Sequence, residues 1–100
     1  MKKIVLLCSA GMSTSMLVTK MRRAAEEQNL DFDIDAYPLN EAENKGADAD
    51  AILLGPQVRF QEASIKKLLP NKKVASINMQ DYGTMNGAKV LNTAIELMEG

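Results

Sequence analysis

The sequence IVLLCSAGMSTSML, residues Ile4 to Leu17, joins an apolar run to a helical pattern through a few small residues. Lys2 to Leu7 predicts a buried strand, because it is short, rich in β-branched residues and leucine, and does not alternate. Cys8 to Met12 predicts a turn. A helix is expected next, capped by Ser13 or a neighbouring hydroxyl and ending near Asn29.

Strand and helix alternate three more times after this unit. The second strand, near Phe32 to Ala36, alternates apolar residues with aspartates, which favours an edge position. Asn40 is expected to cap a short helix, and Asn78 to Met85 to form a polar loop. The other predicted elements are strands over Ala51–Leu54 and Val74–Ile77 and helices over Glu41–Lys45, Phe60–Leu69 and from Asn86 onward. This alternation predicts an α/β fold, with a parallel sheet and helices on both faces.

The chain length and the composition indicate one domain over residues 1–100. Hydrophobic residues are 46% and charged residues 25% of the chain, an ordinary globular mixture. The formal net charge of −1 argues against nucleic acid as a partner. Apolar runs are far shorter than the ~20 residues that cross a bilayer, so we expect no membrane insertion. One cysteine agrees with a reducing compartment, and we expect a cytoplasmic protein.

The chain contains no histidine. This excludes Ser-His-Asp and Cys-His catalysis, because both need an imidazole base. One cysteine without histidine also cannot supply the usual zinc ligands. We therefore expect neither a metal nor a cofactor.

Cys8 stands where the first strand ends and a helix is about to begin, the place where α/β proteins bind ligands. Backbone N–H groups at a helix start lack intrahelical partners and attract anions, and the same field lowers the pKa of a nearby thiol. The pattern predicts a cysteine that accepts phosphate, although a buried cysteine is also often a small packing residue. The candidate phosphate-binding residues are Ser9, Ala10, Gly11, Met12, Ser13, Thr14 and Ser15.

Three motifs in order give the chain a family resemblance: IVLLCSAGMSTSMLV, AILLGPQVRF and DYGTMNGAKVLNTAIELM. The chain resembles, end to end, the IIB component of the bacterial phosphoenolpyruvate-dependent sugar phosphotransferase system, in its lactose/cellobiose family. The resemblance implies a four-stranded parallel sheet between helices on both sides. We expect a three-layer sandwich with strand order 2-1-3-4, similar to low-molecular-weight tyrosine phosphatases.

The resemblance also implies a phosphotransferase activity with a phosphocysteine intermediate. Cys8 would accept a phosphoryl group from a phosphohistidine of the IIA protein. It would then donate the group to a sugar bound by the membrane component IIC, during uptake. The expected sugar is a β-linked disaccharide such as cellobiose, chitobiose or lactose.

Two other functions stay open at this point. In the related phosphatases an arginine six positions after the cysteine binds the phosphate, and here that position is Thr14. Its absence, and the lack of an obvious general acid, favour a carrier over a phosphatase or an arsenate-reductase-like enzyme. The remaining alternative is a non-catalytic anion-binding module.

Further residues are expected at the rim of the site or in contact with partners: Met16, Gly55, Pro56, Gln57, Asp81 and Tyr82. Met12 and Met16 either contact partners or pack under the loop. Gly55 to Gln57 either shapes the rim or forms an ordinary turn, and Arg59 either steers phosphate or is simply solvated. Tyr82 either packs beside the cysteine loop or contacts a partner.

Overall fold

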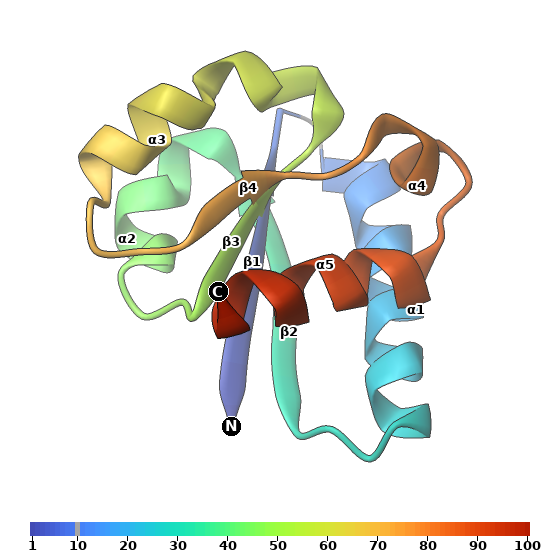
Figure 1. The fold of residues 1–100 in the computed structure, drawn as a ribbon. Helices are drawn as coiled ribbons and strands as arrows, with labels where there is room; N and C mark the ends of the chain where they lie inside the picture. Colours follow the sequence, from blue (N-terminus) through green and yellow to red (C-terminus); the bar gives the residue numbers. More distant parts are fainter. Residues whose placement is uncertain (10) are drawn as a thin grey trace.

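The computed structural model describes residues 1–9 and 11–100, and the side chains of these except for residues 11–13. Its strands are β1 (Lys2–Cys8), β2 (Phe32–Pro38), β3 (Ala51–Leu54) and β4 (Val74–Ser76). Its helices are α1 (Gly11–Glu27), α2 (Ala42–Gly46), α3 (Glu62–Leu68), α4 (Met79–Gly83) and α5 (Gly87–Glu99), with 3-10 turns η1 (Leu39–Glu41) and η2 (Pro56–Gln61) (Figure 1).

The four strands form one parallel sheet in the order β2-β1-β3-β4, which confirms the predicted order. β1 is central, and its Ile4 pairs with Ile34 on one side and Ala51 on the other. β2 lies at the edge, as its aspartates indicated: Ile34 is buried, whereas its neighbour Asp33 is exposed.

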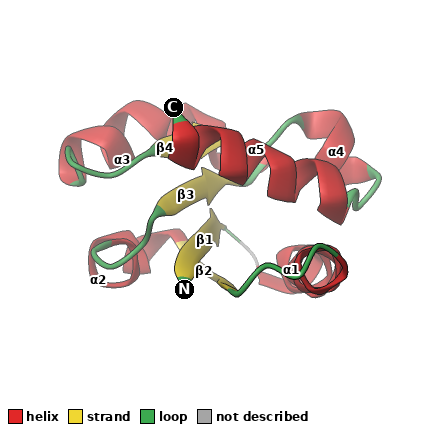
Figure 2. Cartoon of the chain, turned by 60° about the horizontal axis from the view of Figure 1, so that its bottom comes forward, coloured by secondary structure: helices red, strands yellow, loops and turns green. Residues whose placement is uncertain are grey.

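Alternate residues of β1 face opposite layers of helices. Ile4 and Leu6 belong to a core shared with α1 and α5, and Val5 and Leu7 to a core shared with α2 and α3. Figure 2 shows the same arrangement, with α2 and α3 on one side of the sheet and α1, α4 and α5 on the other. The predicted three-layer sandwich is confirmed.

Three local expectations were wrong. α1 begins at Gly11, so Ser13 lies inside its first turn and not at the cap position, while the residue before Gly11 lies outside the described residues. The segment after Asn78 is not a loop, because the Asn78 side chain accepts hydrogen bonds from the amides of Gln80 and Asp81 and starts α4. Asn40 lies within η1 instead of capping a helix, and the cap position of α2 is Glu41.

Candidate functional site

The carboxyl ends of the four strands lie along one border of the sheet, at the top of Figure 1. We call this border the carboxyl edge, as distinct from the edge strand β2. β1 ends there at Cys8, beside Pro38 of β2. β3 leads at the same edge into Gly55, and β4 leads toward Asn78. Parallel pairing therefore brings together segments that are far apart in the sequence.

Cys8 is almost completely covered, with 2% of its surface exposed. Gly55 lies beside it, and the Gly55 N–H donates to the Leu7 carbonyl at 2.9 Å. A Cβ on Gly55 would lie 3.4 Å from the Cβ of Cys8 and 3.0 Å from Oε1 of Gln57. The segment after β3 therefore borders the cysteine, as the strand order required, and a side chain at residue 55 would occupy this space.

The first turn of α1 follows Cys8 after two residues. Ser9 is exposed at the end of β1, and Ala10 lies outside the described residues. The backbone of Gly11, Met12 and Ser13 begins α1, while the positions of their side chains lie outside the description. This turn contains no acidic residue, so nothing in it competes with an anion for the positive end of the helix dipole.

Thr14 is in contact with Tyr82 of α4. Its side chain is fully buried, and its hydroxyl lies 3.2 Å from the hydroxyl of Tyr82, at hydrogen-bonding distance. Tyr82 itself is 8% exposed and packs in the core shared by α1 and α5. The side chain at the position of the phosphatase arginine is therefore directed toward Tyr82.

The sequence holds a signal for the buried position of Thr14. Thr14 precedes Leu17 by three residues and Val18 by four, which places it on the buried face of α1. A hydroxyl on that face needs a partner. The spacing does not say which residue supplies it.

Other candidate residues lie around this edge with differing exposure. Ser15 is exposed and borders a groove of about 170 Å³ between α1 and β2, which Arg22 and Asp35 also line. Pro56 is half-buried and Gln57 exposed, on η2. Asp81 is half-buried in the first turn of α4.

Exposed apolar side chains also occur on the segments that follow the strands. Met16 on α1 is 59% exposed. Phe60 on η2 and Met79 at the start of α4 are 76% and 62% exposed, and the sequence prediction did not single out either one. Arg59, beside Phe60, is exposed.

Glu62 is tied to the end of β4. Lys66 lies 2.8 Å from one of its carboxylate oxygens, and the Ser76 hydroxyl donates to the other at 2.6 Å. These two hydrogen bonds stabilise the ionised form and lower the pKa of Glu62. The contact fixes the start of α3 to the carboxyl end of β4.

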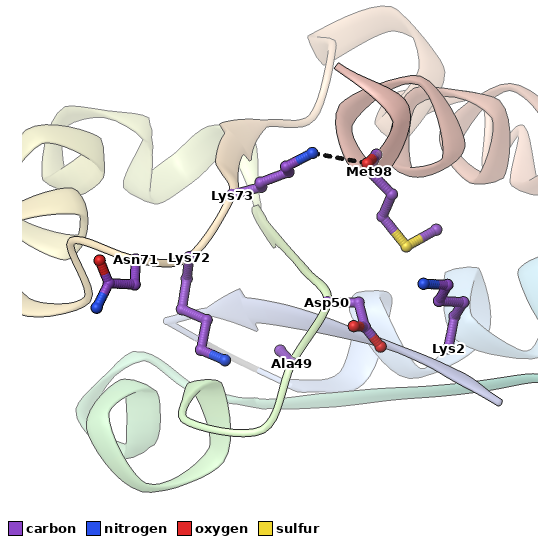
Figure 3. Close-up of a pocket in the computed structure, with 7 residues that line it drawn as sticks. All are labelled: Lys2, Ala49, Asp50, Asn71, Lys72, Lys73 and Met98. Carbon is purple, nitrogen blue, oxygen red and sulfur yellow. Dashed lines mark hydrogen bonds between the residues drawn. The ribbon is translucent and has the colours of Figure 1, made fainter.

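A cavity of about 280 Å³ lies at the opposite edge, where the strands begin. Figure 3 shows its lining by Lys2, Asp50, Lys72 and neighbouring residues, with Lys73 donating to the Met98 carbonyl at 2.6 Å. It contains none of the candidate site residues. Within the described part of the chain, no cluster of three acidic, cysteine or histidine side chains could hold a metal ion. No described helix is long and apolar enough to cross a bilayer.

A family model described as "PTS system, Lactose/Cellobiose specific IIB subunit" matches residues 3–93. The chain belongs to this family. Among relatives of this IIB subunit is the galactose-specific EIIB component of Lactococcus lactis subsp. cremoris, 43% identical over 97% of the chain and 96% of the relative. Another is the oligo-beta-mannoside-specific EIIB component of Bacillus subtilis, 41% identical over 98% and 97% of the two chains.

Solved structures agree with the fold of this IIB subunit. The cellobiose-specific IIB component of Borrelia burgdorferi superposes with a TM-score of 0.82 at 37% identity, covering 98% of this chain and 92% of the other. The lactose-specific IIB domain of Streptococcus pneumoniae gives a TM-score of 0.85, covering 95% of both chains. Its identity is only 17%, so that likeness concerns the fold alone.

Proposed function

We propose that this IIB subunit is a cytoplasmic phosphocarrier in which Cys8 receives and donates a phosphoryl group. One observation carries the proposal: the single cysteine of a histidine-free chain ends β1 and is followed, two residues later, by the N-terminal turn of α1. That turn offers backbone N–H groups and the positive end of a helix dipole to a tetrahedral oxyanion.

The first transfer needs a donor from outside the chain. The thiolate of Cys8 attacks the phosphorus of a phosphohistidine on IIA, so that an S–P bond forms and the P–N bond breaks. The electron pair of the broken bond stays on the imidazole nitrogen. In-line geometry and amide donors to the equatorial oxygens supply most of the catalysis in such transfers.

The second transfer regenerates the thiolate. A hydroxyl of a sugar bound by the membrane component IIC attacks the phosphorus, the S–P bond breaks, and the hydroxyl proton leaves to a base on the acceptor. The sugar we propose is a β-linked disaccharide such as cellobiose, chitobiose or lactose. The cellobiose-specific and oligo-beta-mannoside-specific relatives support this class of substrate, whereas galactose, named for the third relative, is a monosaccharide.

The site favours a carrier over a phosphatase. No arginine follows Cys8 at the sixth position, and the Thr14 side chain that stands there is directed toward Tyr82. Without an arginine and an adjacent acid, the phosphocysteine gains little help toward hydrolysis. Its lifetime would then suffice for the acceptor to arrive.

The exposed apolar residues suit docking by partner proteins. All three exposed side chains lie on segments that follow a strand at the carboxyl edge. Met16 lies on α1 after β1, Phe60 on η2 after β3, and Met79 on α4 after β4. Methionine and phenylalanine are common in the centres of protein interfaces, where they adapt to more than one surface. A carrier needs this, because IIA and IIC contact the same cysteine in turn.

The test is phosphorylation of the intact protein. The protein is incubated with phosphoenolpyruvate and the purified general and IIA components, and its mass is measured. We expect one added phosphate on wild type and none, or one with a different linkage, on Cys8→Ser. Release of phosphate from p-nitrophenyl phosphate would favour the phosphatase, and an unmodified, inactive protein would favour the anion-binding module.

A further inference from the structure

We infer that Tyr82 is a positioning residue, which fixes the first turn of α1 beside Cys8 through its hydrogen bond to Thr14. The inference rests on the proposed function, since the turn that Tyr82 positions is the proposed phosphate-binding turn. The hydroxyls of the two residues lie 3.2 Å apart although 68 positions separate them in the sequence.

Thr14 occupies a place where an apolar residue would be expected. It lies on the buried face of α1 with Leu17, Val18 and Met21, all of them in the core. A hydroxyl at that place constrains the orientation of the helix turn, because a hydrogen bond fixes a distance and an angle more closely than apolar packing does. Among the residues whose side chains the structure describes, Thr14 is the one of this face nearest to Cys8 in the sequence.

Tyr82 has a firm support. The Asn78 side chain caps α4, and the Tyr82 N–H donates to the Asn78 carbonyl at 3.0 Å. On the other side, the Tyr82 carbonyl accepts from the Met85 N–H at 3.1 Å. The backbone of Tyr82 is thus held in α4, whose cap Asn78 lies two residues after the end of β4.

The reason for such a support is geometric. Phosphoryl transfer to Cys8 depends on amides that point at the equatorial oxygens, and small misplacements of catalytic groups are costly. The segment between Cys8 and Thr14 is short and rich in small residues. A contact at Thr14 therefore fixes the turn from its far end.

The experiment separates a positioning role of Tyr82 from a contribution to the stability of the fold alone. In the double variant Thr14→Val with Tyr82→Phe, a methyl group replaces one hydroxyl and the other is removed, so no buried hydroxyl is left without its partner and the change in stability should be small. The two single variants each leave one buried hydroxyl without this partner and should lower the melting temperature. Tyr37→Phe removes the other tyrosine hydroxyl of the chain, on β2, and is the matched control.

We expect the double variant to melt like wild type, yet to accept phosphate from saturating IIA roughly tenfold more slowly, with the KM for IIA unchanged. The single variant Thr14→Ser keeps a hydroxyl opposite Tyr82, so it should retain most of the wild-type rate of phosphate transfer. A wild-type rate in the double variant overturns the inference. So does a higher KM with an unchanged saturating rate, which would make Tyr82 a contact of the donor.

A second measurement keeps this inference distinct from the proposed function. Inorganic phosphate is titrated into each protein while the amide resonances of Gly11, Met12 and Ser13 are followed by NMR. We expect weaker phosphate binding in the double variant than in wild type and in Tyr37→Phe. If wild type accepts nothing from IIA, the proposed function fails, and this titration alone decides: weaker binding in the double variant supports positioning, and equal binding or none in wild type refutes it.

Discussion

Gly87, the first residue of α5, packs directly against the backbone of Lys20 in α1. A Cβ at residue 87 would lie 2.6 Å from the Lys20 carbonyl carbon and 2.8 Å from its oxygen. No side chain can occupy that distance, and backbone atoms move less readily than the end of a flexible side chain. The close approach of α1 to α5 therefore depends on this glycine.

Gly87→Ala should destabilise the protein by about 1–3 kcal/mol, the usual cost of overpacking a tight contact. Chemical denaturation of both proteins measures the change. Gly83→Ala is the matched control, because a Cβ there would meet no atom within 4 Å. Equal stability of the two variants would show that α1 and α5 can separate without cost.

Asn78→Ala should lower the free energy of unfolding by about 1 kcal/mol, because two amides at the start of α4 lose their acceptor. Asn40→Ala is the control, since Asn40 lies inside η1 and occupies neither of its cap positions, Pro38 and Ala42. Thermal unfolding of both variants gives the comparison. A larger loss in Asn40→Ala would contradict the capping pattern seen in the structure.

Met79→Gln and Met16→Gln should weaken docking of IIA. Each removes an exposed apolar contact worth about 1 kcal/mol, so the KM for IIA should rise roughly fivefold with little change in melting temperature. Leu68→Gln is the control: Leu68 is 45% exposed and ends α3, away from the carboxyl edge. An unchanged KM in both methionine variants would remove these residues from the proposed interface.

Glu62 gives a pH-dependent prediction. Its pKa is lowered by the hydrogen bonds from Lys66 and Ser76, so the folded state holds fewer protons than the unfolded one in acid. This contribution to stability is complete well above roughly pH 4.3, the ordinary pKa of glutamate, and is lost as the pH falls through the lower, folded pKa. Neutral Glu62→Gln should therefore lose less stability between neutral and acidic pH than wild type.

The measurement is the midpoint of urea unfolding at a series of pH values. Ser76→Ala should fall between wild type and Glu62→Gln, because it removes one of the two hydrogen bonds. Parallel pH profiles for all three proteins would mean that Glu62 titrates in the same way folded and unfolded.

Much of the architecture could be read from local patterns. The apolar run before Cys8, the alternating aspartates of β2 and the helical spacing after Ser13 depend on residues that are close in the sequence. The strand order 2-1-3-4 was also correct, but it was expected from the family resemblance and not from a local pattern. α4 was missed because five residues are too few for a periodic pattern, although Asn78 was available as a cap.

The sequence by itself determined that a lone cysteine ends a buried strand and precedes a helix, because both elements follow from short-range periodicity. Only the tertiary structure decided what surrounds that cysteine: Gly55 beside it, and Thr14 turned toward Tyr82. The physical reason is that a buried hydroxyl needs a hydrogen-bond partner, but the local sequence does not show which residue supplies it. The partner is chosen by parallel strand pairing, which brings α4, the helix that follows β4, to the start of α1.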